Sequence, residues 1–427
     1  MAFSPPAKMR TALDWKLLLL ALFFAAPAFS QSMPNMPGMS PETFLDAIQQ
    51  HTSSGTDVEP LSTPVPMLMT SRGGWMLMLH GEAFVNAMQQ TGLRGGDKVF
   101  STNWIMPMAQ RSLGPGRLTL RTMLSLEPAT ITERRYPELF QVGETAFGRA
   151  IIDGQHPHDL FMEIAAIYDA KLSPHALLSF YIAPVGDPAI GPIAYPHRVS
   201  ASEDPIATLG HHLEDSTHIA ADVVTAGLAY RNVRLEASGF HGREPDENRW
   251  NIDQGRIDSY STRLTIAPAA NWIGQISAAR IVSPEVLAPN DDQLRTTASI
   301  GYNRPLARGN WSSTLLWGRT RTLHQSQPFN GYLAESTLKF AEKNSIWTRI
   351  ENVDRSNELL DLPNTNDEFL ARVQAYTVGY DRDFHTFTHA ETALGAQLTL
   401  YNKPQFLTPI YGAHPVGAVV FLRARLQ

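Results

Sequence analysis

The sequence predicts an all-β protein, a transmembrane antiparallel β-barrel of about sixteen strands with long extracellular loops and short periplasmic turns. Three observations support this fold class. From residue 74 onward, segments with period-two alternation of apolar and polar residues repeat to the end of the chain. Short polar turns follow every second segment, and longer polar connections follow the others. The number of such segments is even, as closed bacterial barrels require.

The predicted strands are 75–88, 98–110, 117–127, 160–172, 176–185, 219–230, 233–243, 256–267, 272–282, 294–304, 311–321, 332–340, 345–355, 371–384, 390–401 and 416–427. The long connections between them include 129–159, 184–218, 244–255, 323–331, 356–370 and 402–415. This rhythm predicts a first strand that runs outward and a last strand that returns, so the turns face the periplasm and the loops face outside.

Alternation within single strands agrees with a membrane barrel. In 117–127, one face carries Leu118, Leu120, Thr122, Leu124 and Leu126, and the other carries Thr119, Arg121, Met123, Ser125 and Glu127. Lipid outside and water inside would demand two such faces. A closed barrel also satisfies every backbone hydrogen bond, which an open sheet in hydrocarbon cannot do.

The first thirty residues have the composition of a secretory signal peptide. Lys8, Arg10 and Lys16 come before an apolar run, and Ala28 and Ser30 stand at small-residue cleavage positions. We expect residues 1–30 to be removed. The remainder then has 32 Lys and Arg against 40 Asp and Glu, a net charge of −8, which argues against a nucleic-acid partner. The 427-residue chain has no cysteine and therefore no disulfide or thiolate ligand.

Residues 31–73 differ from the rest because they are rich in Met, Pro, Ser and Thr. Ser40 followed by Pro41 is a typical helix start, so we expect one short helix after it and linker around it. The predicted organisation is a signal peptide (1–30), a Met/Pro-rich periplasmic segment (31–73) and an outer-membrane barrel (74–427).

The signal peptide, the strand rhythm and the alternating last strand resemble those of outer-membrane porins and related barrels of Gram-negative bacteria. This resemblance implies a bacterial outer-membrane location, contact with membrane lipid, passage of small solutes or ions, and a homo-trimer. The chain also resembles a group of exported bacterial proteins that share the stretches HPHD (156–159) and REPDENRWNID (243–253). That second resemblance implies a link to copper resistance.

Histidine-rich stretches end or form three of the long loops, so we expect them to meet at the extracellular mouth. The candidate metal ligands there are His156, His158, Asp159, His211, His212, Asp215 and His218. Imidazole with carboxylate suits zinc or copper(II), and we expect copper or zinc if a metal binds. The alternative interpretation is ordinary solvated loop chemistry, with Arg243 and Arg249 paired to the acids.

Three methionines in MPNMPGM, Met33, Met36 and Met39, offer soft thioether ligands to copper(I). A flexible Met/Pro tail is the alternative interpretation. Met67, Met69, Met76 and Met78 lead into the first strand, and packing is the simpler explanation for them.

Alternation also predicts which charged side chains line the pore. These are Glu82, Arg121, Glu127, Glu163, Asp169, Arg234, Glu236, Arg263, Glu335, Arg349, Glu351 and Arg372. Charges of both signs across a water-filled lumen would set ion selectivity.

The function predicted from the sequence is an outer-membrane channel or solute-binding barrel with a mouth lined by His, Asp, Glu and Arg. Two alternatives remain open. One is a metal-handling barrel of copper type. The other is an outer-membrane hydrolase that would pair His218 with Ser216 or His241 with Ser238, although the chain contains no GxSxG motif.

Overall fold

The structure is a computed structural model that describes residues 41–427 except 216–219, 324–326 and 363–369. The expected signal peptide, Ser40 and the methionines Met33, Met36 and Met39 lie outside the described residues. None of the helices within the described part of the chain has the length and apolarity needed to cross a membrane.

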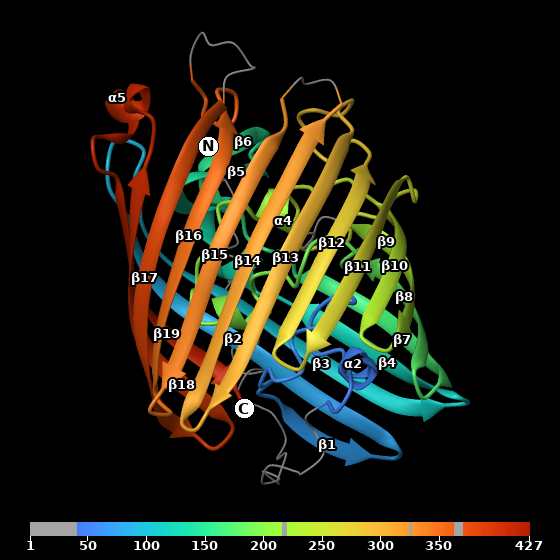
Figure 1. The fold of residues 1–427 in the computed structure, drawn as a ribbon. Helices are drawn as coiled ribbons and strands as arrows, with labels where there is room; N and C mark the ends of the chain where they lie inside the picture. Colours follow the sequence, from blue (N-terminus) through green and yellow to red (C-terminus); the bar gives the residue numbers. More distant parts are fainter. Residues whose placement is uncertain (1–40, 216–219, 324–326, 363–369) are drawn as a thin grey trace, which may run out of the picture. The chain divides into compact units, whose positions relative to one another are not determined.

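Within the described residues, seventeen strands pair in one antiparallel sheet, and sixteen of them close into a barrel because β19 pairs with β2 (Figure 1). The barrel strands are β2 (Trp75–Gln90), β3 (Asp97–Leu113), β4 (Gly116–Leu124), β7 (Phe161–Ser173), β8 (Ala176–Val185), β9 (Ala221–Tyr230), β10 (Val233–His241), β11 (Ser259–Ala269), β12 (Trp272–Ile281), β13 (Gln293–Leu306), β14 (Gly309–Thr322), β15 (Phe329–Phe340), β16 (Asn344–Ser356), β17 (Leu370–Phe387), β18 (Ala390–Asn402) and β19 (Val416–Leu426). Each strand pairs with its neighbours along the chain.

The barrel confirms the predicted fold class strand by strand. Each of the sixteen predicted segments overlaps one barrel strand, and the short turns fall between the strands where the sequence placed them. We call the end with these turns the short-turn end and the opposite end the long-loop end. Alternation holds as well, since Thr119 and Arg121 of β4 are buried inside while Leu120 between them is exposed outside.

Three strands were not predicted. β1 (Leu68–Arg72) forms a hairpin with the start of β2 through Gly73 and Gly74, both at positive φ. It pairs with residues 75–79 of β2, just beyond the stretch that pairs with β19. β5 (Tyr136–Ala146) and β6 (Arg149–Gln155) form a separate hairpin inside the long connection after β4. Pro137 and an irregular register obscure the period-two signal in the β5–β6 hairpin, and β1 has only five residues.

The remaining elements are short and belong to the loops or the N-terminal segment. They are α2 (Phe44–Gln50), α3 (Glu127–Thr130), α4 (His211–Glu214), α5 (Thr408–Tyr411) and three 3₁₀ turns, η1 (Thr132–Arg134), η2 (Val199–Ala201) and η3 (Gln405–Leu407). α2 is the helix expected in residues 31–73. It begins later than predicted, because the side chain of Thr43 caps it by accepting a hydrogen bond from the Asp46 amide.

Residues 44–63, which we call the N-terminal plug, lie against inward-facing side chains of the barrel, whereas the composition predicted a periplasmic linker. Arg121 of β4 donates to the carbonyl oxygens of His51, Ser53 and Gly55. The same guanidinium pairs with Glu163 of β7, at 2.6 Å between Nε and Oε2. A segment with the composition of a linker is therefore bound to charged side chains on the inner wall of the barrel.

Further contacts attach the N-terminal plug to other strands. His51 Nε2 lies 2.6 Å from Asp169 Oδ2 on β7. Arg263 of β11 donates to the Thr56 hydroxyl at 2.8 Å and pairs with Asp57. The carbonyl oxygen and hydroxyl of Ser62 accept from the Asn303 amide group of β13 at 2.7 and 3.1 Å. These contacts lie toward the short-turn end.

In the connection between β8 and β9, residues 186–215 cross the lumen toward the opposite wall. The Thr337 hydroxyl of β15 donates to the Ser200 carbonyl at 2.7 Å. Arg349 of β16 donates to the Ile206 carbonyl at 2.8 Å. Arg425 of β19 donates to the Ser202 carbonyl at 2.6 Å. Together with the N-terminal plug and residues 125–160, this crossing loop fills the lumen with protein.

The buried Arg121–Glu163 pair should dominate attachment of the plug. Arg121→Met leaves Glu163 buried without its cationic partner and removes three hydrogen bonds to plug carbonyls. Loss of one member of a buried pair costs about 3–5 kcal/mol. We expect Arg121→Met to lower the temperature at which the folded, heat-modifiable band is lost on a gel and to make the plug sensitive to protease.

Arg308→Met is the matched control, because Arg308 pairs with Glu342 on the surface with both side chains about two-thirds exposed. Exposed pairs contribute about 0–1 kcal/mol. Equal behaviour of the two variants would contradict the anchoring role of Arg121.

Candidate metal site

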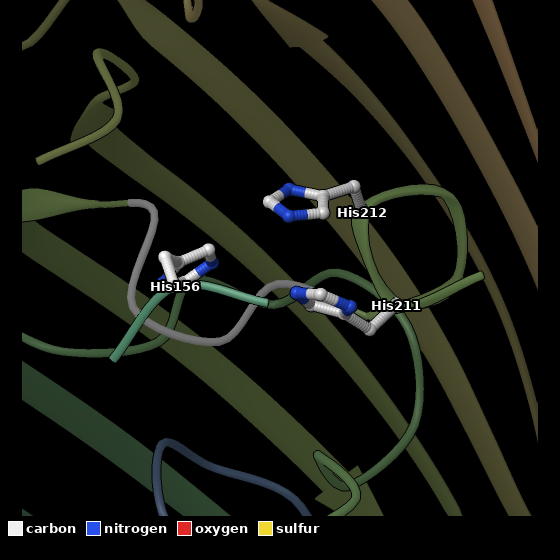
Figure 2. A group of neighbouring side chains, drawn as sticks. All are labelled: His156, His211 and His212. Carbon is white, nitrogen blue, oxygen red and sulfur yellow. The ribbon is translucent and has the colours of Figure 1, made fainter. Parts of the chain in front are cut away.

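Three histidines from two long connections converge inside the barrel. His156 follows β6, and His211 and His212 begin α4. One ligand atom from each lies within 4.8 Å of those of the other two. The ring centroids of His211 and His212 are 4.0 Å apart, and both rings lie within 6 Å of His156. Figure 2 shows His211 and His212 projecting from adjacent positions toward His156.

Local backbone contacts orient two of these rings. His156 Nδ1 lies 3.0 Å from the Pro157 carbonyl oxygen, and His211 Nδ1 lies 3.0 Å from the Thr208 carbonyl oxygen. A ring nitrogen fixed to a backbone carbonyl in this way is the usual outer support of a metal-bound imidazole.

Acidic side chains from two loops surround the three imidazoles. Glu144 Oε1 of β5 lies 3.1 Å from His156 Nε2, and Glu244 Oε1 lies 3.6 Å from His212 Nδ1. Arg249 joins the loops, because it pairs with Glu144 and, at 3.2 Å, with Asp159. All three predicted histidine-rich loops therefore meet, although only two of them supply imidazoles to the group.

Burial sets the protonation of the group. His156 and His211 are 1% and 2% exposed. Burial, helped by the neighbouring His212, lowers the pKa of His211 well below its usual value, and burial lowers the pKa of His212 to about 4. Burial also raises the pKa of Glu144 and brings that of Glu244 to about 7. His211 and His212 are therefore neutral at pH 7, which is the form that binds metal.

His158 lies in the same HPHD stretch but has other partners. Its Nδ1 is 2.9 Å from Glu127 Oε2, and the Tyr195 hydroxyl is 3.3 Å from its Nε2. Burial lowers and Glu127 raises the pKa of His158, with a net upward shift. Asp159 pairs with Arg249, and burial raises the pKa of Asp159 to about 7. These two predicted ligands belong to the supporting ion pairs around the three histidines.

The other predicted ligands separate from the group or fall outside the described residues. The carbonyl oxygen of Asp215 accepts from Arg295 of β13 at 3.1 Å, which fixes the chain just after α4. His218 lies outside the described residues, as do the three N-terminal methionines. The predicted position at an open mouth also differs, because the histidines are covered inside the lumen toward the long-loop end.

Most predicted pore-lining residues lie on the inward side of their strands and are buried: Glu82, Arg121, Glu163, Asp169, Arg234, Glu236, Arg263, Glu335, Arg349 and Glu351. Glu127 lies beyond the end of β4 and contacts His158. Arg372 faces outward, because its neighbours Ala371 and Val373 occupy the inward positions of β17. Its half-exposed side chain pairs with Asp354 on the outer face.

Sequence reasoning missed three residues at the site. Gln141 and Glu144 lie in β5 of the unpredicted hairpin, and Tyr195 lies in a loop without a recognisable motif. Gln141 Nε2 is 3.3 Å from His211 Nδ1. None of these has a signal in a single sequence, because loop contacts depend on how the barrel closes.

His241 and Ser238 are not placed as the catalytic pair that the hydrolase alternative requires. The two residues are an odd number of positions apart on β10 and face opposite sides of the sheet. His241 Nδ1 contacts Asp258 at 3.2 Å, while the Ser238 hydroxyl contacts the Thr225 hydroxyl at 2.7 Å. The pair Ser216 and His218 lies outside the described residues.

Comparisons with known proteins give structural likeness only. No protein-family model and no curated protein matches the chain. An anion-selective porin from Comamonas acidovorans is 10% identical with a TM-score of 0.49 and covers 82% of this chain and 99% of its own. OmpF from Salmonella typhi, in a complex with daunomycin, is 9% identical with a TM-score of 0.49 and covers 84% and 100%. The channel DcaP of Acinetobacter baumannii is 10% identical with a TM-score of 0.46 and covers 84% and 98%.

Because these similarities are low, the barrel is assigned from the strand register of this chain alone. The properties of those porins are not assigned to this chain. The link to copper resistance that the HPHD resemblance implied is not supported by any of the comparisons.

The three imidazoles should bind a borderline divalent ion. We expect calorimetry to show zinc or copper(II) binding to the wild type and at least about 100-fold weaker binding to His156→Ala/His211→Ala, since even outer-sphere changes cost about 10–100-fold. His241→Ala is the control, because His241 lies outside the group. Equal metal affinity of all three proteins would contradict the assignment of these histidines as a metal site.

Proposed function

We propose that the protein is a transport barrel of the bacterial outer membrane, closed in the structure described, that binds a divalent transition metal inside its lumen on the way through. The convergence of His156, His211 and His212 is the observation that carries the proposal. The remaining support comes from the outer surface, the filled lumen and the chemistry of the ligands.

The outer surface fits lipid. Large apolar side chains are exposed around the barrel, among them Val85, Leu120, Ile182, Leu235, Ile276, Ile300, Leu315, Ile350, Val378, Leu398 and Val420. Soluble proteins rarely expose contiguous apolar surface of this extent. In contact with lipid hydrocarbon, the same apolar surface carries no cost of exposure to water.

Aromatic side chains mark one edge of this apolar belt. Exposed rings near the short-turn end are Tyr230, Trp272, Trp311, Phe340, Phe384 and Phe387. Tyr302 lies between Trp272 and Trp311, with ring centroids 4.5 and 5.4 Å away. Membrane barrels carry such aromatic girdles at the lipid–water interfaces. This edge therefore supports insertion with the short turns at one membrane surface.

The filled lumen supports a gated route in place of an open pore. A sixteen-stranded barrel is wide enough for an aqueous channel unless protein occupies it. Here the N-terminal plug and two long connections bond to the inner wall of the barrel. Passage of a solute requires some of these segments to move, so transport should be slow and saturable.

The ligand set supports the choice of ion. Imidazole nitrogens with nearby carboxylates suit zinc and copper(II), while magnesium and calcium prefer oxygen ligands. Bound zinc would be held by His156, His211 and His212, with Glu144 and Glu244 balancing its charge.

Zinc entry into proteoliposomes tests the proposal. We expect wild-type protein to admit zinc to an enclosed dye at a rate that saturates with zinc concentration, and to admit magnesium much more slowly. His156→Ala/His211→Ala should slow zinc entry, and His241→Ala should match the wild type.

Two outcomes would contradict the proposal. Rapid, unsaturable entry of both ions would indicate an open pore. Zinc entry no faster than into protein-free liposomes, together with zinc binding in solution, would leave a binding protein without transport.

A further inference from the structure

A second group of metal-binding side chains lies on the inner wall of the barrel. Met78 and His80 are on β2, and Met106 and Met108 are on β3. The strand register places Met78 opposite Met108 and His80 opposite Met106. All four side chains are buried on the inward face. Residues opposite one another on antiparallel strands have Cβ atoms about 4.5–5.5 Å apart, so the four side chains form one compact block.

More methionines and two aromatic rings surround this block. Met123 of β4 and Met162 of β7 are buried in the same cluster, and Met67 and Met69 pack against it. The cluster thus gathers seven of the fourteen methionines of the chain. The sequence explained Met67, Met69 and Met78 by packing alone, without the partners that the barrel brings to them.

The imidazole of His80 packs against two other rings, those of Trp104 and His197. Trp104 precedes Met106 by two residues on the same face, and its ring stands edge-on to His80 at 5.1 Å between centroids. His197 of the crossing loop lies 4.3 Å from Trp104 and 5.7 Å from His80. Among the described residues, the buried His80 Nε2 has no hydrogen-bond partner.

Packing explains the methionines better than it explains His80. A Leu or Phe at position 80 would fill the same space without a polar atom, whereas a buried polar atom without a partner costs about 1–3 kcal/mol. A metal ion bound by the imidazole and the neighbouring sulfur atoms would remove that cost.

We propose that Met78, His80, Met106 and Met108 form a binding site for a soft monovalent ion, copper(I) or silver(I). Thioether sulfur selects such ions, and the chain has no cysteine to compete. The face of Trp104 adds attraction for a cation beside it.

This site is distinct from the three-histidine group in ligands and in the ions it takes. Zinc prefers imidazole, thiolate and carboxylate, so a site of three thioethers and one imidazole binds it poorly. The inference does not rest on the proposed transport of divalent metal.

Silver nitrate titration in chloride-free buffer is the test, because silver does not change oxidation state. The protein is the full chain carrying Met33→Leu/Met36→Leu/Met39→Leu, which removes the N-terminal methionines as a competing site. We expect this background to bind silver, and the further change Met106→Leu/Met108→Leu to weaken binding at least about tenfold.

Met88→Leu in the same background is the matched control. Met88 is also buried and inward-facing on β2, but it packs with Phe84 and Phe421 in a different cluster. Leucine conserves volume, so the variants should fold alike. If the double variant fails to show the heat-modifiable band, Met106→Leu alone takes its place.

X-ray absorption of the silver-loaded protein gives the ligand identity. We expect sulfur and nitrogen neighbours in the background protein and loss of sulfur in Met106→Leu/Met108→Leu. Zinc affinity should be unchanged by these methionine substitutions, whatever the outcome for the histidine site. Equal silver affinity in the background and the double variant, or a spectrum without sulfur, would overturn the proposal.

Discussion

Buried charge in a filled barrel must be paired, and this constraint organises the whole interior. The inward faces of the strands carry arginines that are almost fully buried, including Arg121, Arg263, Arg349 and Arg423. An isolated buried charge is very costly, whereas a guanidinium offers five donors that several acceptors can share. The N-terminal plug and the crossing loop supply many of those acceptors, as backbone carbonyls for Arg121 and as the Glu203 carboxylate for Arg423. The barrel strands and the segments inside the lumen therefore depend on each other, since each satisfies polar groups of the other.

The same pairing positions the histidine group. α4 carries His211 and His212, and the chain on both sides of it is fixed to the wall. The Leu209 amide donates to Glu351, and Arg355 donates to the Leu209 carbonyl at 2.6 Å. Arg295 holds the Asp215 carbonyl on the other side. A one-turn helix has little stability of its own, so these charged contacts bring the imidazoles to His156.

The sequence was sufficient for the barrel because closure in lipid imposes alternation and turn rhythm on every strand. It was insufficient for the five-residue β1, and for the β5–β6 hairpin and the N-terminal plug, which are not part of the barrel wall. Alternation failed to predict the orientation of Arg372, which lies near the end of its strand, faces outward and pairs with Asp354. For the site, residue type selected His156, His211 and His212, which the structure brings together, but it could not separate them from His158. Glu144 and the Met78–Met108 pairing depend on contacts between distant segments, which one sequence does not reveal.

The neighbours of each buried histidine distinguish those that form ion pairs from those that we propose as metal ligands. His51 and His158 each have a carboxylate as their closest polar partner, at 2.6 and 2.9 Å, and such a pair satisfies the imidazole as an ion pair or hydrogen bond. His156 and His212 also have acidic neighbours, Glu144 at 3.1 Å and Glu244 at 3.6 Å, but in addition the rings of His156, His211 and His212 face one another, with one ligand atom of each within 4.8 Å of the other two. His80 faces thioethers and aromatic edges, which are poor partners for a ring nitrogen. A cation is the one kind of group that satisfies several such nitrogens or sulfurs at once. In HPHD, the histidines on the two sides of Pro157 thus have different surroundings, because His156 lies against two imidazoles as well as Glu144, whereas His158 contacts Glu127 and Tyr195.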